Sequence, residues 1–97
     1  NRGGYKIAVL DLESQLQVLQ TIEDVAVIGV PDSLRGEEVV AFIVPVEGVT
    51  VSEVESDVHR AIPHEAQPKY LRYIDAIPLT DCSKIDKELL KEWYNKE

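Results

Sequence analysis

Two unbroken apolar runs constrain the fold of this chain more than any other feature. Residues 25–30 read VAVIGV and residues 39–44 read VVAFIV, and both runs are rich in β-branched side chains without polar alternation. Such runs are typical of β-strands that are covered on both faces. The stretch between them, PDSLRGEE, has the Pro, Asp, Ser and Gly of a turn. This composition predicts that the two strands are antiparallel neighbours.

Three amphipathic patterns predict helices around these strands. The first covers about residue 9 or 10 to residue 20, and its apolar face is formed by Leu12, Leu16 and Leu19. The second begins at a capping box and ends at Pro63, with an apolar stripe of Val54, Val58, Ala61 and Ile62. The capping box is either Thr50 with Glu53 or Ser52 with Glu55. The third begins at a cap formed by Asp86, with an apolar face of Ile85, Leu89 and Trp93.

Two further strands complete the predicted order. A short strand at residues 5–7 follows the pair Gly3 and Gly4, and residues 70–74 (YLRYI) form a third main strand. The order strand, helix, strand, strand, helix, strand, helix predicts an α+β domain. We expect a small, mostly antiparallel sheet of about three main strands plus a short N-terminal strand or hairpin, packed with three helices.

Size and charge limit the classes of function. The 97 residues, 44% of them hydrophobic, suit one soluble domain over residues 1–97. The net charge of −8 disfavours nucleic acid and anionic membrane surfaces as partners. The longest apolar run is far shorter than the about 20 residues of a membrane span. A single cysteine, Cys82, excludes an intrachain disulfide and fits the cytoplasm. The absence of methionine and the start at Asn1 suggest a piece of a longer protein.

The stretch PLTDCSKIDKELL, residues 78–90, places Lys84 between a polar loop and the last predicted helix. A lysine there is mildly opposed by the helix dipole, so helix stability does not explain its position. Its ammonium suits a site for carboxylate or phosphate oxygens. The alternative from chemistry alone is a solvated loop lysine. For Cys82 the alternatives are a thiol activated by the nearby cation and an ordinary surface thiol without a base.

A metal centre is not expected. His59 and His64 flank Pro63 and do not share a helix face, whereas a zinc site needs three or four convergent ligands.

Three ordered motifs resemble the C-terminal domain of the adenylate-forming superfamily, which contains acyl-CoA synthetases, aryl-acid ligases and the adenylation domains of peptide synthetases. RGGYKI followed by DLE at residues 11–13 is similar to the motif after that family's hinge. VAVIGVPDSLRGEEVVAFIV is similar to the stretch that follows it. PLTDCSK is similar to the last core motif, in which Pro, Thr, Gly and Lys recur.

The resemblance implies an AMP-forming ligase of the acid–thiol type, to which this chain contributes the mobile C-terminal lid domain. A carboxylic acid and ATP form an acyl-adenylate, and a thiol of CoA or of a carrier-protein pantetheine then displaces AMP. Lys84 matches the adenylation lysine. Gly3 and Gly4 match a loop that lines the thiol tunnel after domain rotation, although a tight turn alone also explains a glycine pair. Lys6 lies where relatives carry a basic residue near the nucleotide phosphate.

The resemblance also implies partners that this chain lacks. The large N-terminal adenylation domain and the hinge are absent, and that domain would bind most of the ATP, its Mg²⁺ and the acid. The isolated chain is therefore expected to be inactive.

One position departs from the motif, because Ser83 stands where relatives carry Gly. A serine in a left-handed conformation costs about 1 kcal/mol or more. The alternatives are thus a catalytically degenerate lid or interaction module of the same fold, and an unrelated α+β binding domain.

Overall fold

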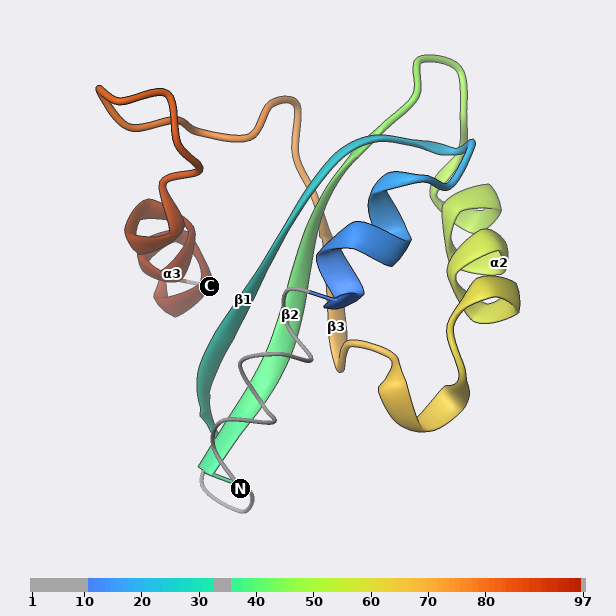
Figure 1. Ribbon diagram of the computed structural model, residues 1–97, viewed down its shortest axis with the longest axis horizontal. Helices are drawn as coiled ribbons and strands as arrows, with labels where there is room; N and C mark the ends of the chain where they lie inside the picture. Colours follow the sequence, from blue (N-terminus) through green and yellow to red (C-terminus); the bar gives the residue numbers. More distant parts are fainter. Residues whose placement is uncertain (1–10, 33–35, 97) are drawn as a thin grey trace.

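The computed structural model describes residues 11–32 and 36–96 of the chain. Its centre is a sheet of three strands, β1 (Ile22–Asp32), β2 (Gly36–Pro45) and β3 (Tyr70–Tyr73). Residues 11–17 form a helix before β1. The remaining elements are α2 (Val51–Ala61), the short 3₁₀-helix η1 (His64–Ala66) and α3 (Lys87–Asn95) (Figure 1).

The sheet is mixed, with strand order β1-β2-β3. β1 and β2 form a long antiparallel hairpin in which Val27 pairs with Ala41, which confirms the predicted pairing. β2 and β3 are parallel, with Ala41 opposite Leu71. Parallel neighbours need a crossover, and α2 and η1 provide it between β2 and β3. The α+β class with three helices is confirmed, whereas the short strand predicted at residues 5–7 lies outside the described residues.

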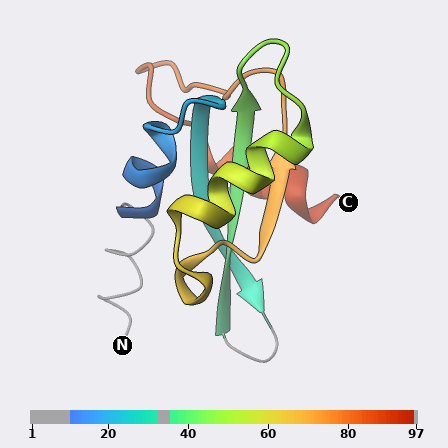
Figure 2. The ribbon, with the colours of Figure 1, turned by 90° about the vertical axis from the view of Figure 1, so that its right-hand side faces the viewer.

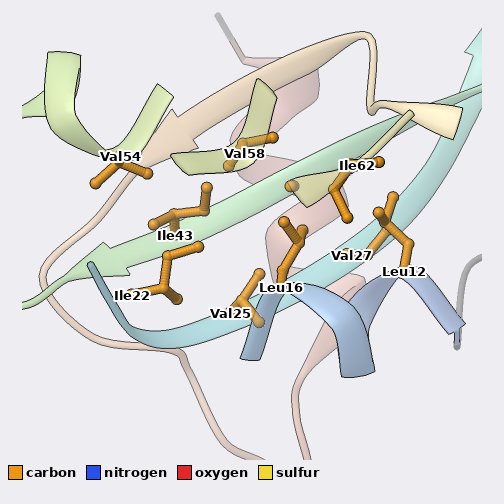
Figure 3. Close-up of a cluster of buried hydrophobic side chains, with 10 residues drawn as sticks. Leu12, Leu16, Ile22, Val25, Val27, Ile43, Val54, Val58 and Ile62 are labelled. Carbon is orange, nitrogen blue, oxygen red and sulfur yellow. The ribbon is translucent and has the colours of Figure 1, made fainter. Parts of the chain in front are cut away.

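Both faces of the sheet are covered, as the unbroken apolar runs predicted. The first helix and α2 lie on one face, and α3 lies on the other (Figure 2). Side chains alternate between the faces along each strand. The core under α2 is formed by Leu12, Leu16, Ile22, Val25, Val27, Ala41, Ile43, Val54, Val58 and Ile62 (Figure 3). The core under α3 is formed by Ala26, Ile28, Val30, Val40, Phe42, Ile77 and Leu90.

Helix α2 begins at the first of the two capping boxes that the sequence offered. The Thr50 hydroxyl accepts a hydrogen bond from the Glu53 backbone N–H at 3.1 Å, and the Glu53 carboxylate accepts one from the Thr50 N–H at 2.9 Å. The helix ends with Ile62 as its C-cap, directly before Pro63. Of the predicted apolar stripe, Ala61 is exposed and the other three side chains are buried.

Two details of the helix predictions are wrong. The first helix ends at residue 17 instead of residue 20, because the chain turns toward β1 with a hydrogen bond from the Leu19 N–H to the Leu16 carbonyl (3.1 Å). In α3 the buried side chain is Leu90, whereas Trp93 is 39% exposed. Leu90 and Tyr94 form a second apolar pair one turn apart, and this pair packs against the sheet.

Glu13 joins three elements of the fold. Its Oε2 atom accepts a hydrogen bond of 2.7 Å from the Val27 backbone N–H in β1. The same oxygen lies 2.9 Å from Nζ of Lys87, in the first turn of α3. In the described sheet β1 is an edge strand, and the outward N–H groups of an edge need a partner. One carboxylate therefore closes part of this edge and holds the start of α3, three residues after Lys84.

We expect Glu13→Ala to lower the free energy of unfolding by about 2 kcal/mol, because it removes the charged acceptor of a partly buried N–H. Glu13→Gln keeps an oxygen acceptor but loses the ion pair, so its loss should be smaller. Urea unfolding of this chain, followed by circular dichroism, measures both. The control is Glu23→Ala, whose side chain is exposed. Equal stabilities of Glu13→Ala and Glu23→Ala would contradict this role.

Candidate active site

Lys84 lies on a small hairpin between β3 and α3. Leu79 and Ile85 form an antiparallel bridge, and the Asp86 N–H donates to the Pro78 carbonyl at 2.9 Å. Asp86 then caps α3, because its side chain accepts from the Leu89 N–H at 3.1 Å. The hairpin projects from the side of the sheet opposite α2 (Figure 1). The predicted cap of the last helix is confirmed, and the lysine stands two residues before it.

Backbone hydrogen bonds close the hairpin tightly. The Ser83 N–H donates to the Thr80 carbonyl at 2.9 Å, which makes a four-residue turn, and the Thr80 N–H donates to the Lys84 carbonyl at 2.7 Å. Ser83 itself has φ 63°, in the left-handed region. This is the pattern of a three-residue hairpin loop, in which a turn is followed by one left-handed residue, a position that favours glycine. Ser83 is the only non-glycine residue with positive φ among those the structure describes.

We expect Ser83→Gly to raise the free energy of unfolding by roughly 0.5–1 kcal/mol, because glycine adopts the left-handed conformation without the steric cost that serine has. Ser56→Gly is the matched control: Ser56 is exposed within α2, where the same replacement should be destabilising. Thermal unfolding of both variants measures whether each replacement raises or lowers the free energy of unfolding. Destabilisation by Ser83→Gly would show that the serine hydroxyl makes a contribution larger than the backbone strain.

The ammonium group of Lys84 is exposed and has no ion pair within the described residues. Other lysines form ion pairs: Nζ of Lys69 lies 3.9 Å from Oε2 of Glu38, and Nζ of Lys91 lies 4.0 Å from Oε2 of Glu88. The N-terminus of α3 adds partial positive charge close to Lys84 in the sequence. This end of the domain therefore suits carboxylate or phosphate oxygens.

Besides Lys84, three further residues are predicted for the site. Gly3, Gly4 and Lys6 lie outside the described residues. Cys82 lies in the same loop as Lys84, where its side chain is exposed and forms no disulfide. The structure thus describes one of the four predicted site positions, Lys84, as an accessible lysine on a closed loop.

A separate pocket of about 760 Å³ lies beside α2, η1 and the start of β3, and its lining includes Glu55, His59, His64 and Lys69. Both histidines are exposed, and within residues 11–32 and 36–96 no three His, Cys, Asp or Glu side chains are placed to hold a metal ion. Burial and, to a lesser extent, the Glu55 carboxylate raise the pKa of the nearby Tyr73 from 10.0 to about 12. The raised pKa keeps the tyrosine neutral to well above physiological pH, and its hydroxyl donates to Glu55 at 3.4 Å.

Sequence reasoning missed the roles of Glu13 and Thr80. Periodicity predicts that Glu13 lies on the solvated face of the first helix, opposite Leu12 and Leu16, but its side chain is only 18% exposed. Its contacts with β1 and α3 depend on tertiary packing. Thr80 belongs to the PLTDCSK motif, and its hydroxyl also accepts hydrogen bonds within the loop. The local signal that could have identified it is a threonine four residues before the lysine, at the start of a turn. None of the described helices has the length and apolar content of a membrane span.

Comparison with known proteins identifies the family. The model of the AMP-binding enzyme C-terminal domain matches residues 11–84, and Lys84 is the last of these. The mitochondrial malonate–CoA ligase of Mus musculus is 37% identical over 95 residues, which are 95% of this chain and 16% of that protein. The vibriobactin-specific 2,3-dihydroxybenzoate–AMP ligase of Vibrio cholerae is 34% identical over 98 residues, covering 98% of this chain and 18% of that protein.

A solved structure agrees with these matches. The acyl-CoA synthetase of Brucella canis is similar with a TM-score of 0.75 and 28% identity, over 91% of this chain and 17% of that one. This chain thus spans less than a fifth of the length of these relatives. Sequence and fold together establish that the chain belongs to the AMP-binding enzyme C-terminal domain family of the adenylate-forming ligases.

Proposed function

We propose that this chain is the mobile C-terminal lid domain of an AMP-forming acyl- or aryl-acid ligase, in which Lys84 serves adenylation. The observation that carries the proposal is the lysine hairpin. The ammonium of Lys84 is exposed and has no ion pair in the described residues. Its loop is closed by hydrogen bonds and lies directly before the N-terminus of α3. Lys84 also lies within the segment that matches the family. A charge held in this way suits transient contact with substrate oxygens.

In the first half-reaction, a carboxylate oxygen of the acid forms a bond to the α-phosphorus of ATP, and the bond to pyrophosphate breaks. The products are an acyl-adenylate and pyrophosphate. Lys84 would contact the carboxylate and the α-phosphate oxygens while negative charge is redistributed between them. A preorganised cation at that point lowers the barrier without contributing covalent chemistry.

In the second half-reaction, a thiol of CoA or of a carrier-protein pantetheine attacks the acyl carbon and AMP leaves. We place Gly3 and Gly4 beside the thiol arm in this step and Lys6 near the nucleotide phosphate, on the basis of the motif alone. Rotation of the lid domain between the two steps would exchange the lysine hairpin for the glycine loop. The partner domain would supply most of the contacts to ATP, its Mg²⁺ and the acid.

A full-length ligase containing this chain provides the test. Exchange of labelled pyrophosphate into ATP that depends on the acid measures the first half-reaction, and formation of the acyl-thioester measures the whole reaction. Malonate and 2,3-dihydroxybenzoate form a suitable panel with fatty acids. Two relatives are named for the first two acids, and a fatty acyl CoA synthetase of Mycobacterium tuberculosis has a similar structure. Exchange with at least one acid supports the proposal.

The left-handed Ser83 favours a second candidate, a degenerate lid or interaction module of the same fold. Its backbone strain could displace the lysine hairpin from the position that adenylation requires. This candidate predicts that the full-length protein exchanges pyrophosphate with none of the acids although it binds ATP.

A further inference from the structure

Thr80 forms hydrogen bonds with both the backbone N–H and the backbone carbonyl of Lys84. The Thr80 N–H donates to the Lys84 carbonyl at 2.7 Å, and the Thr80 hydroxyl accepts from the Lys84 N–H at 3.3 Å. No other hydrogen bond of the Lys84 backbone is formed within the described residues. Among the described residues, Thr80 is therefore the only hydrogen-bond partner of the Lys84 backbone, from which the long side chain starts.

The same hydroxyl also organises the tip of the loop. It accepts a second hydrogen bond, from the Cys82 N–H at 3.3 Å, while the Thr80 carbonyl accepts from the Ser83 N–H at 2.9 Å. Three successive N–H groups, those of Cys82, Ser83 and Lys84, thus point to atoms of Thr80. These bonds enclose Ser83 and oppose relaxation of its left-handed backbone, which glycine would adopt without strain.

The hydrogen bonds of the Thr80 hydroxyl should contribute little to the stability of the domain. Thr80 and the loop residues from 81 to 84 are exposed, so water can replace the hydroxyl as a hydrogen-bond acceptor at small cost. Water cannot fix the direction in which Lys84 leaves the loop. A lysine side chain is flexible, and displacement of a catalytic group by about 1 Å can reduce a rate by 10²-fold.

We infer that Thr80 is a positioning residue for the adenylation step, acting through the backbone of Lys84. The inference rests on the proposed function, because it assumes that Lys84 contacts the substrate. It predicts that removal of the Thr80 hydroxyl slows adenylation and leaves the second half-reaction unchanged, although the loop remains folded.

The test compares Thr80→Val, which has nearly the same shape without an acceptor, with Thr80→Ser, which keeps the hydroxyl. Both are made in the full-length ligase together with Lys84→Ala and Thr50→Val. Thr50 caps α2, on the opposite side of the sheet from the hairpin, so its replacement destabilises the domain without touching the loop (Figure 1). The measurements are acid-dependent pyrophosphate exchange, thiolysis of a supplied acyl-adenylate, and melting temperature.

We expect Thr80→Val to slow pyrophosphate exchange roughly 10- to 100-fold, mainly in kcat, with thiolysis and melting temperature close to those of the wild type. Thr80→Ser should restore most of the exchange rate. Thr50→Val should lower the melting temperature and leave exchange near the wild-type rate. If Thr80→Val is poorly folded, Thr80→Ala is used in its place, because it removes the same hydrogen-bond acceptor. Thr80→Ala is then compared with Thr80→Ser.

Three outcomes would overturn the inference. If Lys84→Ala slows exchange and Thr80→Val does not, Thr80 has no positioning role while the proposed function stands. If Thr80→Val slows both half-reactions equally, or Thr80→Ser fails to restore exchange, the effect is a general loss of structure. If Lys84→Ala exchanges as fast as the wild type, the proposed function fails, and with it the reason to position this lysine.

Discussion

In the full-length ligase, Lys84→Ala is expected to exchange labelled pyrophosphate into ATP about 100- to 1,000-fold more slowly than the wild type. Under the proposed function, the variant loses the cation that contacts the carboxylate and α-phosphate oxygens while their charge is redistributed. Thiolysis of a supplied acyl-adenylate should be nearly unchanged, because the proposed function assigns that step to the glycine loop and not to Lys84. Saturation curves in ATP and in the acid separate binding from catalysis, and the loss should fall mainly on kcat.

Lys91→Ala is the matched control for this prediction. Lys91 lies on α3, close to the hairpin in the sequence, and its ammonium lies 4.0 Å from Glu88 at the surface. Surface pairs of this kind contribute little, so the variant should retain the wild-type rate within about twofold. Equal exchange rates for Lys84→Ala and Lys91→Ala would contradict the catalytic role. Equal losses in both half-reactions of Lys84→Ala would instead indicate a folding defect.

The sequence predicted the centre of the fold well, because two apolar runs of this kind are buried only as strands that are covered on both faces. A strand such as residues 25–30, with no polar side, needs cover on both faces, and the structure provides it from α2 and from α3. The presence of a capping box was also predictable, because it is a local arrangement within four residues. The choice of Thr50 with Glu53 over Ser52 with Glu55 came from the structure.

Choices that depend on tertiary contacts were less predictable. Helix α3 carries two apolar pairs, and periodicity does not decide whether Leu89 with Trp93 or Leu90 with Tyr94 meets the sheet. Packing against the Phe42 face selects the second pair. The carboxylate of Glu13 likewise bonds an N–H that is 14 residues away in the chain. No local pattern encodes such a contact.

The candidate site also has features that the sequence could predict and features that it could not. A left-handed Ser83 could be foreseen as a consequence of the motif, and its φ of 63° supports that reasoning. The closure of the loop on Thr80 follows from hydrogen bonds within five residues, yet the sequence alone does not distinguish a hydroxyl that faces inward from one that faces solvent. Positions 3, 4 and 6 stay predictions.

Phe42→Ala is expected to lower the free energy of unfolding of this chain by about 3–5 kcal/mol, since it removes a large, fully buried side chain and leaves a cavity. Phe42 is 2% exposed and lies on the middle strand, in the core that also contains Ile77 and Leu90. The loss is large because domains of this size are stable by only about 5–15 kcal/mol. Urea unfolding followed by the fluorescence of Trp93 measures it.

The position of Phe42 links this loss to the lysine hairpin. Leu90 anchors α3 to the Phe42 core, and Asp86, at the start of the same helix, terminates the hairpin. A cavity at Phe42 should therefore loosen α3 before the α2 side of the sheet, and amide exchange should increase first in residues 79–90. Val18→Ala, at a side chain that is 79% exposed, should change stability by no more than about 0.5 kcal/mol. Uniform acceleration of exchange across both faces would show that the two cores unfold as one unit, and that the lysine hairpin is no more sensitive to this core than the rest of the domain.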